Sequence, residues 1–271
     1  MLDFLGYAFI RNAIIIGMML AMTASLLSPF LVLNRQSMIA DGLSHASFTG
    51  IVLGTLLSDQ PYLVAIPFVM AASVLIRYLS VNRKINNDAA IGLVSSVSFA
   101  IGLIMVKLGD GFSISVESIL VGNMFTATTS EFIMSALVLV LTGLFVLITY
   151  RKLFLMTYDE DFARFSGIRV TRLSYVLSAL TALFIVVGVR TIGILLITAL
   201  VIFPSEVSGL WTRRFGSALA LGTVTSVLIV PAGVIIAHPL GIPAGSTIVV
   251  LYALTLTVSL LATSVNRRQS S

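Results

Sequence analysis

The sequence contains no cysteine, and only 10% of its 271 residues are charged. The absence of cysteine excludes disulfides, iron–sulfur clusters and thiolate metal sites, so a bound metal would need His, Asp, Glu or backbone oxygen ligands. A soluble domain carries about 25% charged residues, and this chain could not cover its surface with polar groups. Because 58% of its residues are hydrophobic and its mean hydropathy is +1.09, the composition predicts an integral membrane protein.

Two sequence patterns are also missing. There is neither a Gly-rich phosphate-binding loop ending in Lys-Ser or Lys-Thr nor a nucleophile elbow, so we expect the chain not to bind or hydrolyse ATP itself. The N-terminal residues 1–6 lack a basic region and a small-residue cleavage site, and they read as mature sequence rather than a signal peptide. The net charge of +5 lies mostly in loops beside apolar runs, which membrane orientation explains better than nucleic-acid binding.

Nine apolar runs approach the roughly 20 residues that are needed to cross a bilayer. A shorter run, Ile114–Phe125, contains Glu117 and Gly122 and is more typical of a half-helix or re-entrant segment. The sequence therefore predicts an all-α, polytopic transmembrane helix bundle of about eight or nine spans, forming one domain over residues 1–271. The nine runs lie at residues 12–33, 39–58, 61–80, 88–107, 132–150, 172–189, 191–211, 216–237 and 244–264.

The loops between these runs divide by charge. The positive-inside rule places the basic ones in the cytoplasm and the others outside. Nine spans with the N-terminus outside and the C-terminus inside satisfy this division. If residues 114–125 also crossed the membrane, the spans that precede them would have to be assigned a different orientation. The basic loops are Asn34–Gln36, Asn82–Lys84, Arg151–Lys152, Arg164–Arg172, Arg213–Arg214 and Asn266–Arg268, and the outer ones are Ser58–Pro61, Gly109–Gly111 and His238–Gly241.

The stretch Ser37–Gly50 places Asp41 four residues before His45, one of only two histidines. On a helix these positions share a face, with Cβ atoms about 6 Å apart, so the two side chains could hold a divalent cation or begin a four-ligand site. Ionisable groups within apolar spans mark a pathway or a site by default. The alternative is a local ion pair near a helix start. These residues alone leave both interpretations open.

Three other ionisable residues are weaker candidates. Asp88 opens the fourth run, where an acid is more typical of a helix cap than of a metal contact. Glu206 lies near the inner end of the seventh run, and we expect it to pair with Arg213 or Arg214 rather than to line the pathway. His238 lies in the predicted outer loop, where an exposed loop histidine is favoured over a transient contact with an external cation.

The longest hydrophilic segment, Arg151–Arg172, contains three consecutive acids, Asp159, Glu160 and Asp161, followed by Gly167. Acids favour a helix N-terminus and glycine favours its end, so the pattern predicts one short cytoplasmic helix between two spans. It is either an ordinary interfacial loop helix or a docking helix for a cytoplasmic partner.

With these motifs in order, the chain resembles the membrane permease of the bacterial ABC importers for zinc, manganese or iron(II). Six ordered matches over nearly the whole length are specific, although no single one would be. Val121 in place of Phe, and Glu206 in place of a small residue, depart from the family pattern. The matching segments are Arg35–Gly50, which includes Asp41 and His45, and then Asp88–Gly92, Leu120–Asn123, Asp159–Gly167, Gly193–Pro204 and Pro243–Val249.

This resemblance implies a permease of the type II ABC importer kind in a bacterial cytoplasmic membrane. A homodimer of permease subunits would form the pathway within membrane lipid, a dimer of cytoplasmic ABC ATPases would drive alternating access, and an extracellular metal-binding lipoprotein would deliver the ion. The alternative is a self-sufficient secondary metal transporter or channel. The residues matched to the ATPase-docking segment, 156–169, are Asp159, Glu160, Asp161, Phe162, Ala163 and Gly167.

The resemblance also places Asp41 and His45 on the metal pathway, with Asp88 and Glu206 as further pathway or gate candidates. Two-fold symmetry would bring two Asp and two His together, a set that suits zinc, manganese or iron(II). We expect the transported ion to be zinc first and manganese second, with no permanently bound cofactor. Asp41 lies near the inner end of its predicted span, whereas such transporters usually bind near the midplane. Either the second span starts deeper, or the first half is threaded in reverse.

Overall fold

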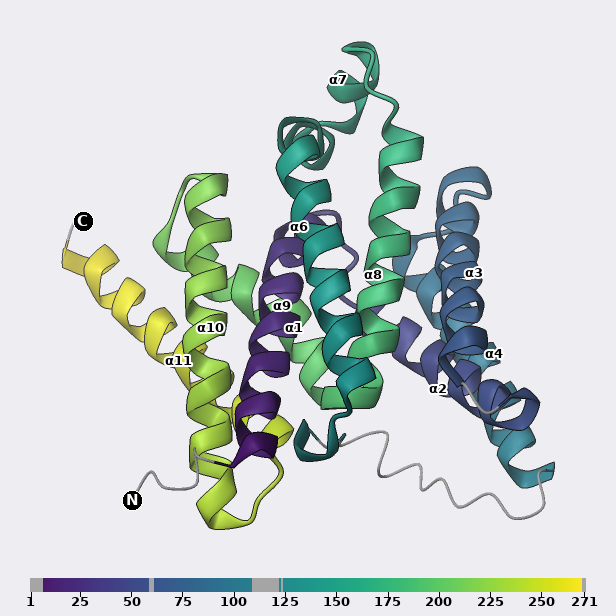
Figure 1. The fold of residues 1–271 in the computed structure, drawn as a ribbon. Helices are drawn as coiled ribbons and strands as arrows, with labels where there is room; N and C mark the ends of the chain where they lie inside the picture. Colours follow the sequence, from purple (N-terminus) through teal and green to yellow (C-terminus); the bar gives the residue numbers. More distant parts are fainter. Residues whose placement is uncertain (1–6, 59–60, 109–121, 123, 270–271) are drawn as a thin grey trace.

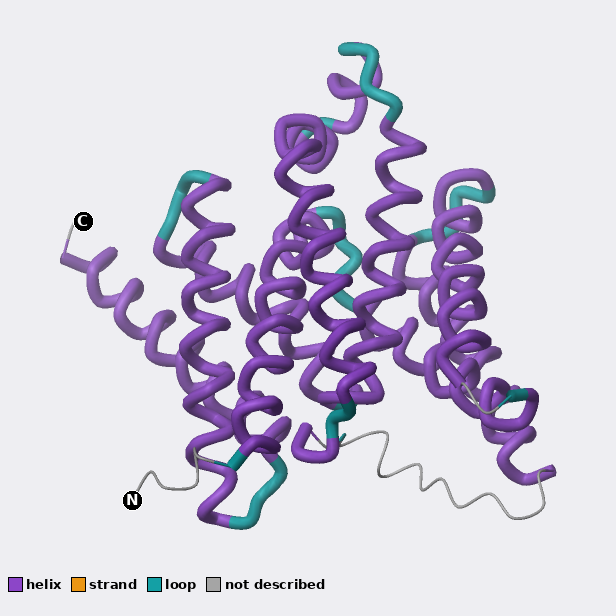
Figure 2. Tube along the Cα trace, in the orientation of Figure 1, coloured by secondary structure: helices purple, strands orange, loops and turns teal. Residues whose placement is uncertain are grey.

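The computed structural model describes residues 7–58, 61–108, 122 and 124–269, and within these ranges the chain is helical with no strand (Figure 2). The predicted all-α fold is confirmed. In chain order the helices are α1 (Ala8–Leu33), α2 (Ile39–Leu57), α3 (Pro61–Asn82), α4 (Asn87–Leu108), the 3-10 turn η2 (Met124–Thr126), α6 (Thr129–Tyr158), α7 (Glu160–Phe165), α8 (Val170–Ile192), α9 (Ile194–Trp211), α10 (Phe215–Leu240) and α11 (Ala244–Gln269).

Eight of the described helices are long and apolar enough to cross a membrane, namely α1, α3, α4, α6, α8, α9, α10 and α11. The ninth predicted span corresponds to α2, which has 19 residues but is more polar. Asp41, His45 and four Ser or Thr residues lower its hydropathy. The prediction of eight or nine spans is therefore confirmed, and the ambiguous helix is the one that carries the candidate metal ligands.

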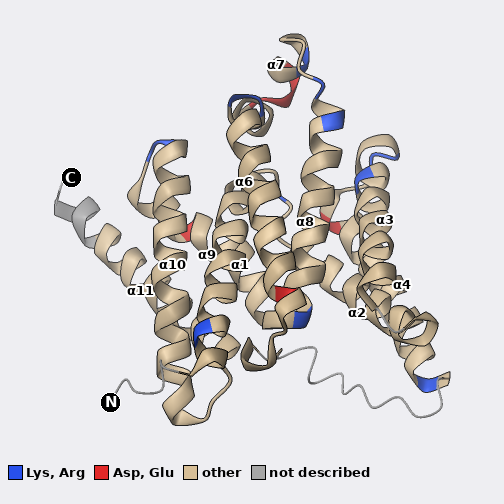
Figure 3. Ribbon diagram, in the orientation of Figure 1, with Lys and Arg blue, Asp and Glu red and all other residues tan. Residues whose placement is uncertain are grey.

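The nine long helices run in alternating directions, so that α1 begins at the lower end of the bundle in Figure 1 and α11 ends toward the upper one. Most of the Lys and Arg residues of the described chain lie at the upper end of the ribbon, where the connections α1–α2, α3–α4, α6–α8 and α9–α10 are (Figure 3). Helix α4 ends and α6 begins at the same lower end, while the side of the membrane on which each end lies stays a prediction. Of the run 114–125, only Gly122, Met124 and Phe125 lie within the described residues.

Two helices form the centres of the packing. Helix α1 contacts α6, α9 and α10, and α2 contacts α3, α4 and α8. Small residues let α2 approach α3 closely: a Cβ on Gly54 would lie 2.4 Å from the carbonyl oxygen of Pro61 and 2.6 Å from its Cα. Such close approach is typical of helix pairs in membranes, where dispersion contacts replace the hydrophobic effect as the source of association.

A one-residue turn joins α8 to α9 at Gly193, whose φ of +83° favours glycine. Gly122, with φ +65°, lies directly against this turn, and a Cβ on Gly122 would come within 2.3 Å of the Gly193 nitrogen. Gly122, the one described residue of the Leu120–Asn123 motif, thus lies against the backbone of the α8–α9 turn.

Candidate metal site and docking helix

Asp41 and His45 lie one turn apart in the first half of α2, with Asp41 in the first turn. The Asp41 Oδ2 and His45 Nε2 atoms are 3.9 Å apart, so the predicted shared face is confirmed. An ion held about 2.1 Å from each ligand atom would require this gap to close by roughly half an ångström. A small rotamer adjustment can supply that change. The pair can therefore act as two ligands of one cation.

The surroundings of the Asp41–His45 pair fit a site that a second chain would complete better than a site that is complete within one chain. The His45 ring packs on Phe99 of α4, with ring centroids 4.7 Å apart, while the His45 Nδ1 is buried and has no hydrogen-bond partner within the part of the chain that the structure describes. The Asp41 side chain is 46% exposed. Among the described residues no cluster of three or more His, Cys, Asp or Glu is present. The described residues of one chain thus bring together two candidate ligands and leave the Asp41 side of the pair open.

The position of α2 bears on the depth of this pair. Figure 1 draws α2 in the lower part of the bundle, below the end where the basic connections gather. The α1–α2 connection is held by the Gln36 amide, which donates to the Leu31 carbonyl at 2.9 Å, and by the Ile39 amide, which donates to the Gln36 carbonyl at 3.0 Å. Of the two explanations for the depth of Asp41, this arrangement agrees with a second span that starts deeper.

The other two acidic candidates lie apart from this pair. Asp88 is exposed in the first turn of α4, where an acid interacts favourably with the positive end of the helix. Glu206 is exposed on α9 and lines a cavity of about 430 Å³ together with Arg213 and Arg214. Within the described part of the chain, however, Glu206 forms no ion pair, so the expected pairing with an arginine is not formed.

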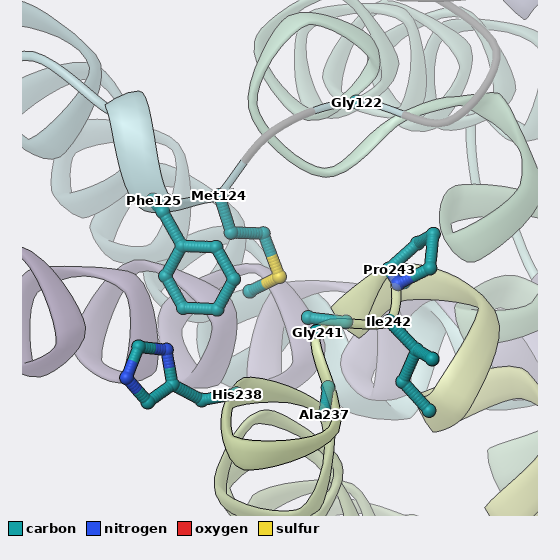
Figure 4. Close-up of a pocket in the computed structure, with 10 residues that line it drawn as sticks. Gly122, Met124, Phe125, Ala237, His238, Gly241, Ile242 and Pro243 are labelled. Carbon is teal, nitrogen blue, oxygen red and sulfur yellow. The ribbon is translucent and has the colours of Figure 1, made fainter. Parts of the chain in front are cut away.

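His238 does not lie in an outer loop as predicted. It belongs to the last turn of α10, which continues through Pro239 to Leu240. Its ring lies 5.8 Å from the Phe125 ring and 6.1 Å from the Phe9 ring, measured between centroids. Figure 4 shows His238 and Phe125 at one edge of a cavity of about 390 Å³ at the lower end of the bundle.

The predicted short helix after the acidic run is present as α7 and stands out from the upper end of the bundle (Figure 1). The Asp159 carboxylate caps it by accepting from the Phe162 amide at 2.8 Å, and Gly167 follows its end with φ +80°. Ala163 is buried, whereas Phe165 is 92% exposed. Helix α7 therefore presents an aromatic side chain outward from a fixed base.

Sequence reasoning missed one charged cluster at the lower end. Glu131, only 7% exposed, pairs with Arg190 at 3.2 Å and accepts from the Tyr62 hydroxyl at 3.3 Å. The Arg190 guanidinium lies 4.8 Å from the centroid of the Tyr62 ring. Glu131 also completes a capping box with Thr128 at the start of α6. The Thr-x-x-Glu spacing was a readable signal for the cap, but no local pattern shows that the partners come from α3 and α8.

The chain is similar to proteins of known description over most of its length. The Streptococcus parasanguinis manganese import system permease protein ScaB is 30% identical over 253 residues, covering 93% of this chain and 90% of that protein. The Yersinia pestis chelated iron transport system membrane protein YfeD is 30% identical over 256 residues, covering 94% and 86%. The solved structure of PsaBC from Streptococcus pneumoniae in complex with Fab superposes with a TM-score of 0.84 at 27% identity, covering 95% and 93%.

A family model described as the ABC 3 transport family matches residues 6–263. Among the described helices, the match covers α1 to α10 in full and α11 as far as residue 263. The chain is therefore a multi-pass membrane protein that belongs to the ABC 3 transport family, which confirms the family resemblance found in its motifs.

Proposed function

We propose that this chain is the permease subunit of an ATP-driven importer of a divalent transition metal, and that Asp41 and His45 are its metal ligands. The Asp41–His45 pair carries the proposal: two ligand atoms 3.9 Å apart, on a described long helix that is less apolar than a typical membrane span, with a half-exposed carboxylate. A second copy related by a two-fold axis would complete a four-ligand site of nitrogen and oxygen. Relatives whose names specify metal transport support the same function.

The nature of the ligands does not choose among the first-row ions, because imidazole and carboxylate suit manganese, iron and zinc alike. The names of the relatives specify manganese or chelated iron, and zinc finds no specific support among them. Manganese is therefore the first ion to test, and zinc, which the sequence motifs favoured, is the second. The ion is cargo, so it must bind strongly enough to enter and weakly enough to leave.

Energy would come from separate ATPase subunits that dock at the end bearing α7. The Phe165 ring is 92% exposed on a helix whose Ala163 is buried. Among the described residues, the acids beside it are engaged only within α7: Glu160 pairs with Arg164 at 2.6 Å and Asp159 caps the Phe162 amide. That combination fits a protein-docking helix better than an interfacial helix whose apolar side chains lie in lipid. The proposal favours an ABC importer over a self-sufficient channel or secondary transporter.

The metal role is tested with Asp41→Asn and His45→Gln, which keep the approximate size of each side chain. We expect both to lose metal uptake and bound metal while the protein still inserts and assembles. Thr55→Val is the matched control on the same helix, because its hydroxyl bonds only to the α2 carbonyls of Ile51 and Val52. Normal uptake in both site variants would remove these residues from the pathway.

The choice of ion is tested by measuring the metal content of the purified complex in an equimolar mixture of manganese and zinc. Manganese enrichment would support the first choice, and zinc enrichment would reverse the order. Separately, an ATP-binding subunit should co-purify with the chain. Intact metal transport by the chain in the absence of that subunit would contradict the importer mechanism.

A further inference from the structure

A groove at the basic end of the bundle, between α6 and α8, is distinct from the candidate metal site. Its volume is about 530 Å³. Three of its lining residues are cationic and none is acidic. The lining consists of Thr149 and Lys152 from α6, the connection Ser166–Arg169, and Arg172, Leu173 and Val176 from α8. A positive concave surface of this kind favours an anionic ligand.

Two of the three cations, Arg169 and Arg172, lie where the local backbone makes a positive charge unfavourable. Arg169 is the N-cap residue of α8 and Arg172 lies in its first turn, with no acid in that turn and no side-chain cap. A helix N-terminus carries a partial positive charge, so nearby cations are destabilising there unless an anion is present. Within the described part of the chain, Lys152, Arg169 and Arg172 form no ion pair. An anion in the groove would therefore relieve repulsion and meet three donors.

On each of the two helices that flank the groove, an exposed apolar residue lies one turn from a cation; Val176 lines the groove itself and Ile148 lies beside it, next to the lining residue Thr149. Ile148 lies one turn from Lys152 on α6 and is 72% exposed, and Val176 lies one turn from Arg172 on α8 and is 45% exposed. Because α6 runs toward the basic end and α8 runs away from it, both apolar residues lie deeper in the bundle than their cations. The surface thus changes from cationic to apolar along the direction of the membrane normal.

We propose that this groove binds an anionic phospholipid, with its phosphate between Lys152, Arg169 and Arg172 and an acyl chain along Ile148 and Val176. Basic pockets between transmembrane helices on the cytoplasmic side are suited to such headgroups. The occupant is a lipid rather than free phosphate because the apolar half of the surface is exposed beside the cations. Ser166 and Gly167 also line the groove, so the lipid would contact the connection between α7 and α8.

The test uses the purified full chain in detergent, titrated with phosphatidylglycerol and, separately, with phosphatidylcholine and inorganic phosphate, while its thermal unfolding is followed. Each basic side chain near an anionic headgroup accounts for roughly a fivefold change in affinity. The double variant Lys152→Gln/Arg172→Gln should therefore bind phosphatidylglycerol about 25-fold more weakly than the native chain. Native mass spectrometry should show the same loss of co-purified anionic lipid.

The matched control is Arg83→Gln/Lys84→Gln, which removes the same charge from another exposed connection at the basic end. It should retain native affinity for phosphatidylglycerol. In phosphatidylcholine alone, the unfolding temperature of the Lys152→Gln/Arg172→Gln variant should equal or exceed that of the native chain, because the variant removes repulsion at the α8 N-terminus. If both double variants lost affinity for phosphatidylglycerol equally, the effect would come from general surface charge, and the proposed lipid site would be wrong. Stabilisation by inorganic phosphate equal to that by phosphatidylglycerol would also overturn the lipid assignment.

Discussion

The Glu131 cluster permits a quantitative test of what holds α3, α6 and α8 together at the lower end of the bundle. Glu131→Gln keeps the capping function, since Gln also serves in a capping box, but it removes the charge opposite Arg190. Breaking a fully buried pair costs about 3–5 kcal/mol. The Arg190 side chain is 40% exposed, so solvent screens its charge, and we expect roughly 1–2 kcal/mol instead.

Glu131→Ala removes two further contributions. The capping interaction with the Thr128 amide, at 2.8 Å, is worth about 1 kcal/mol, and the hydrogen bond from Tyr62 about 1 kcal/mol more. The total loss is therefore about 3–4 kcal/mol. At roughly 3 °C per kcal/mol for a chain of this size, Tm should fall by about 3–6 °C for Gln and about 9–12 °C for Ala.

The assay is thermal unfolding of the purified chain, with Glu131→Gln, Arg190→Gln and the double variant forming a cycle that isolates the pair. The double variant should cost little more than either single change, because each single change already breaks the ion pair. Arg11→Gln, an exposed cation on α1 near the same end, is the control and should leave Tm unchanged. Additive losses in the cycle, or equal losses for Gln and Ala, would refute this account of the cluster.

Three further outcomes are expected. Gly122→Ala should destabilise the chain more than Gly241→Ala, since both glycines have φ near +65° but only Gly122 has a backbone atom in the way, 2.3 Å from the added Cβ; equal Tm losses would contradict the contact. Gly54→Ala should lower Tm and Gly209→Ala should not, because only the first meets α3 backbone within 3 Å. Phe165→Ser should leave Tm unchanged but abolish co-purification of the ATPase, because the ring is 92% exposed; retained ATPase binding would remove Phe165 from the docking surface.

The helices could be read from the sequence because long apolar runs and basic loops are local signals. The spacing of Asp41 and His45 likewise placed both on one face of a helix before any tertiary contact was known. The cluster of Glu131 with Tyr62 and Arg190 could not be found in this way. Its three members come from three helices, with Tyr62 and Glu131 69 residues apart, and hydrophobic periodicity carries no information on which residues pair at that range.

The error at His238 has a different physical origin. The predicted outer loop includes Pro239, yet a proline near the end of a helix sacrifices only one hydrogen bond. The helix ends instead at Gly241, whose left-handed conformation lets its amide donate to the His238 carbonyl and lets the Ile242 amide donate to the Ala237 carbonyl at 3.3 Å. That is the pattern of a glycine-terminated helix, so Gly241 was the informative residue.

The polarity of α2 also has a consequence for biosynthesis. Helices enter the bilayer from the translocon according to their own hydropathy, and Asp and His weaken that preference. Helix α2 falls short of the apolar character of the other eight, but thirteen of its residues are buried, chiefly by packing with α3 and α4. We therefore expect α2 to enter the bilayer stably only once α3 and α4 have been synthesised. A nascent chain halted after α2 should leave this helix accessible to membrane-impermeant reagents, and one extended past α4 should protect it.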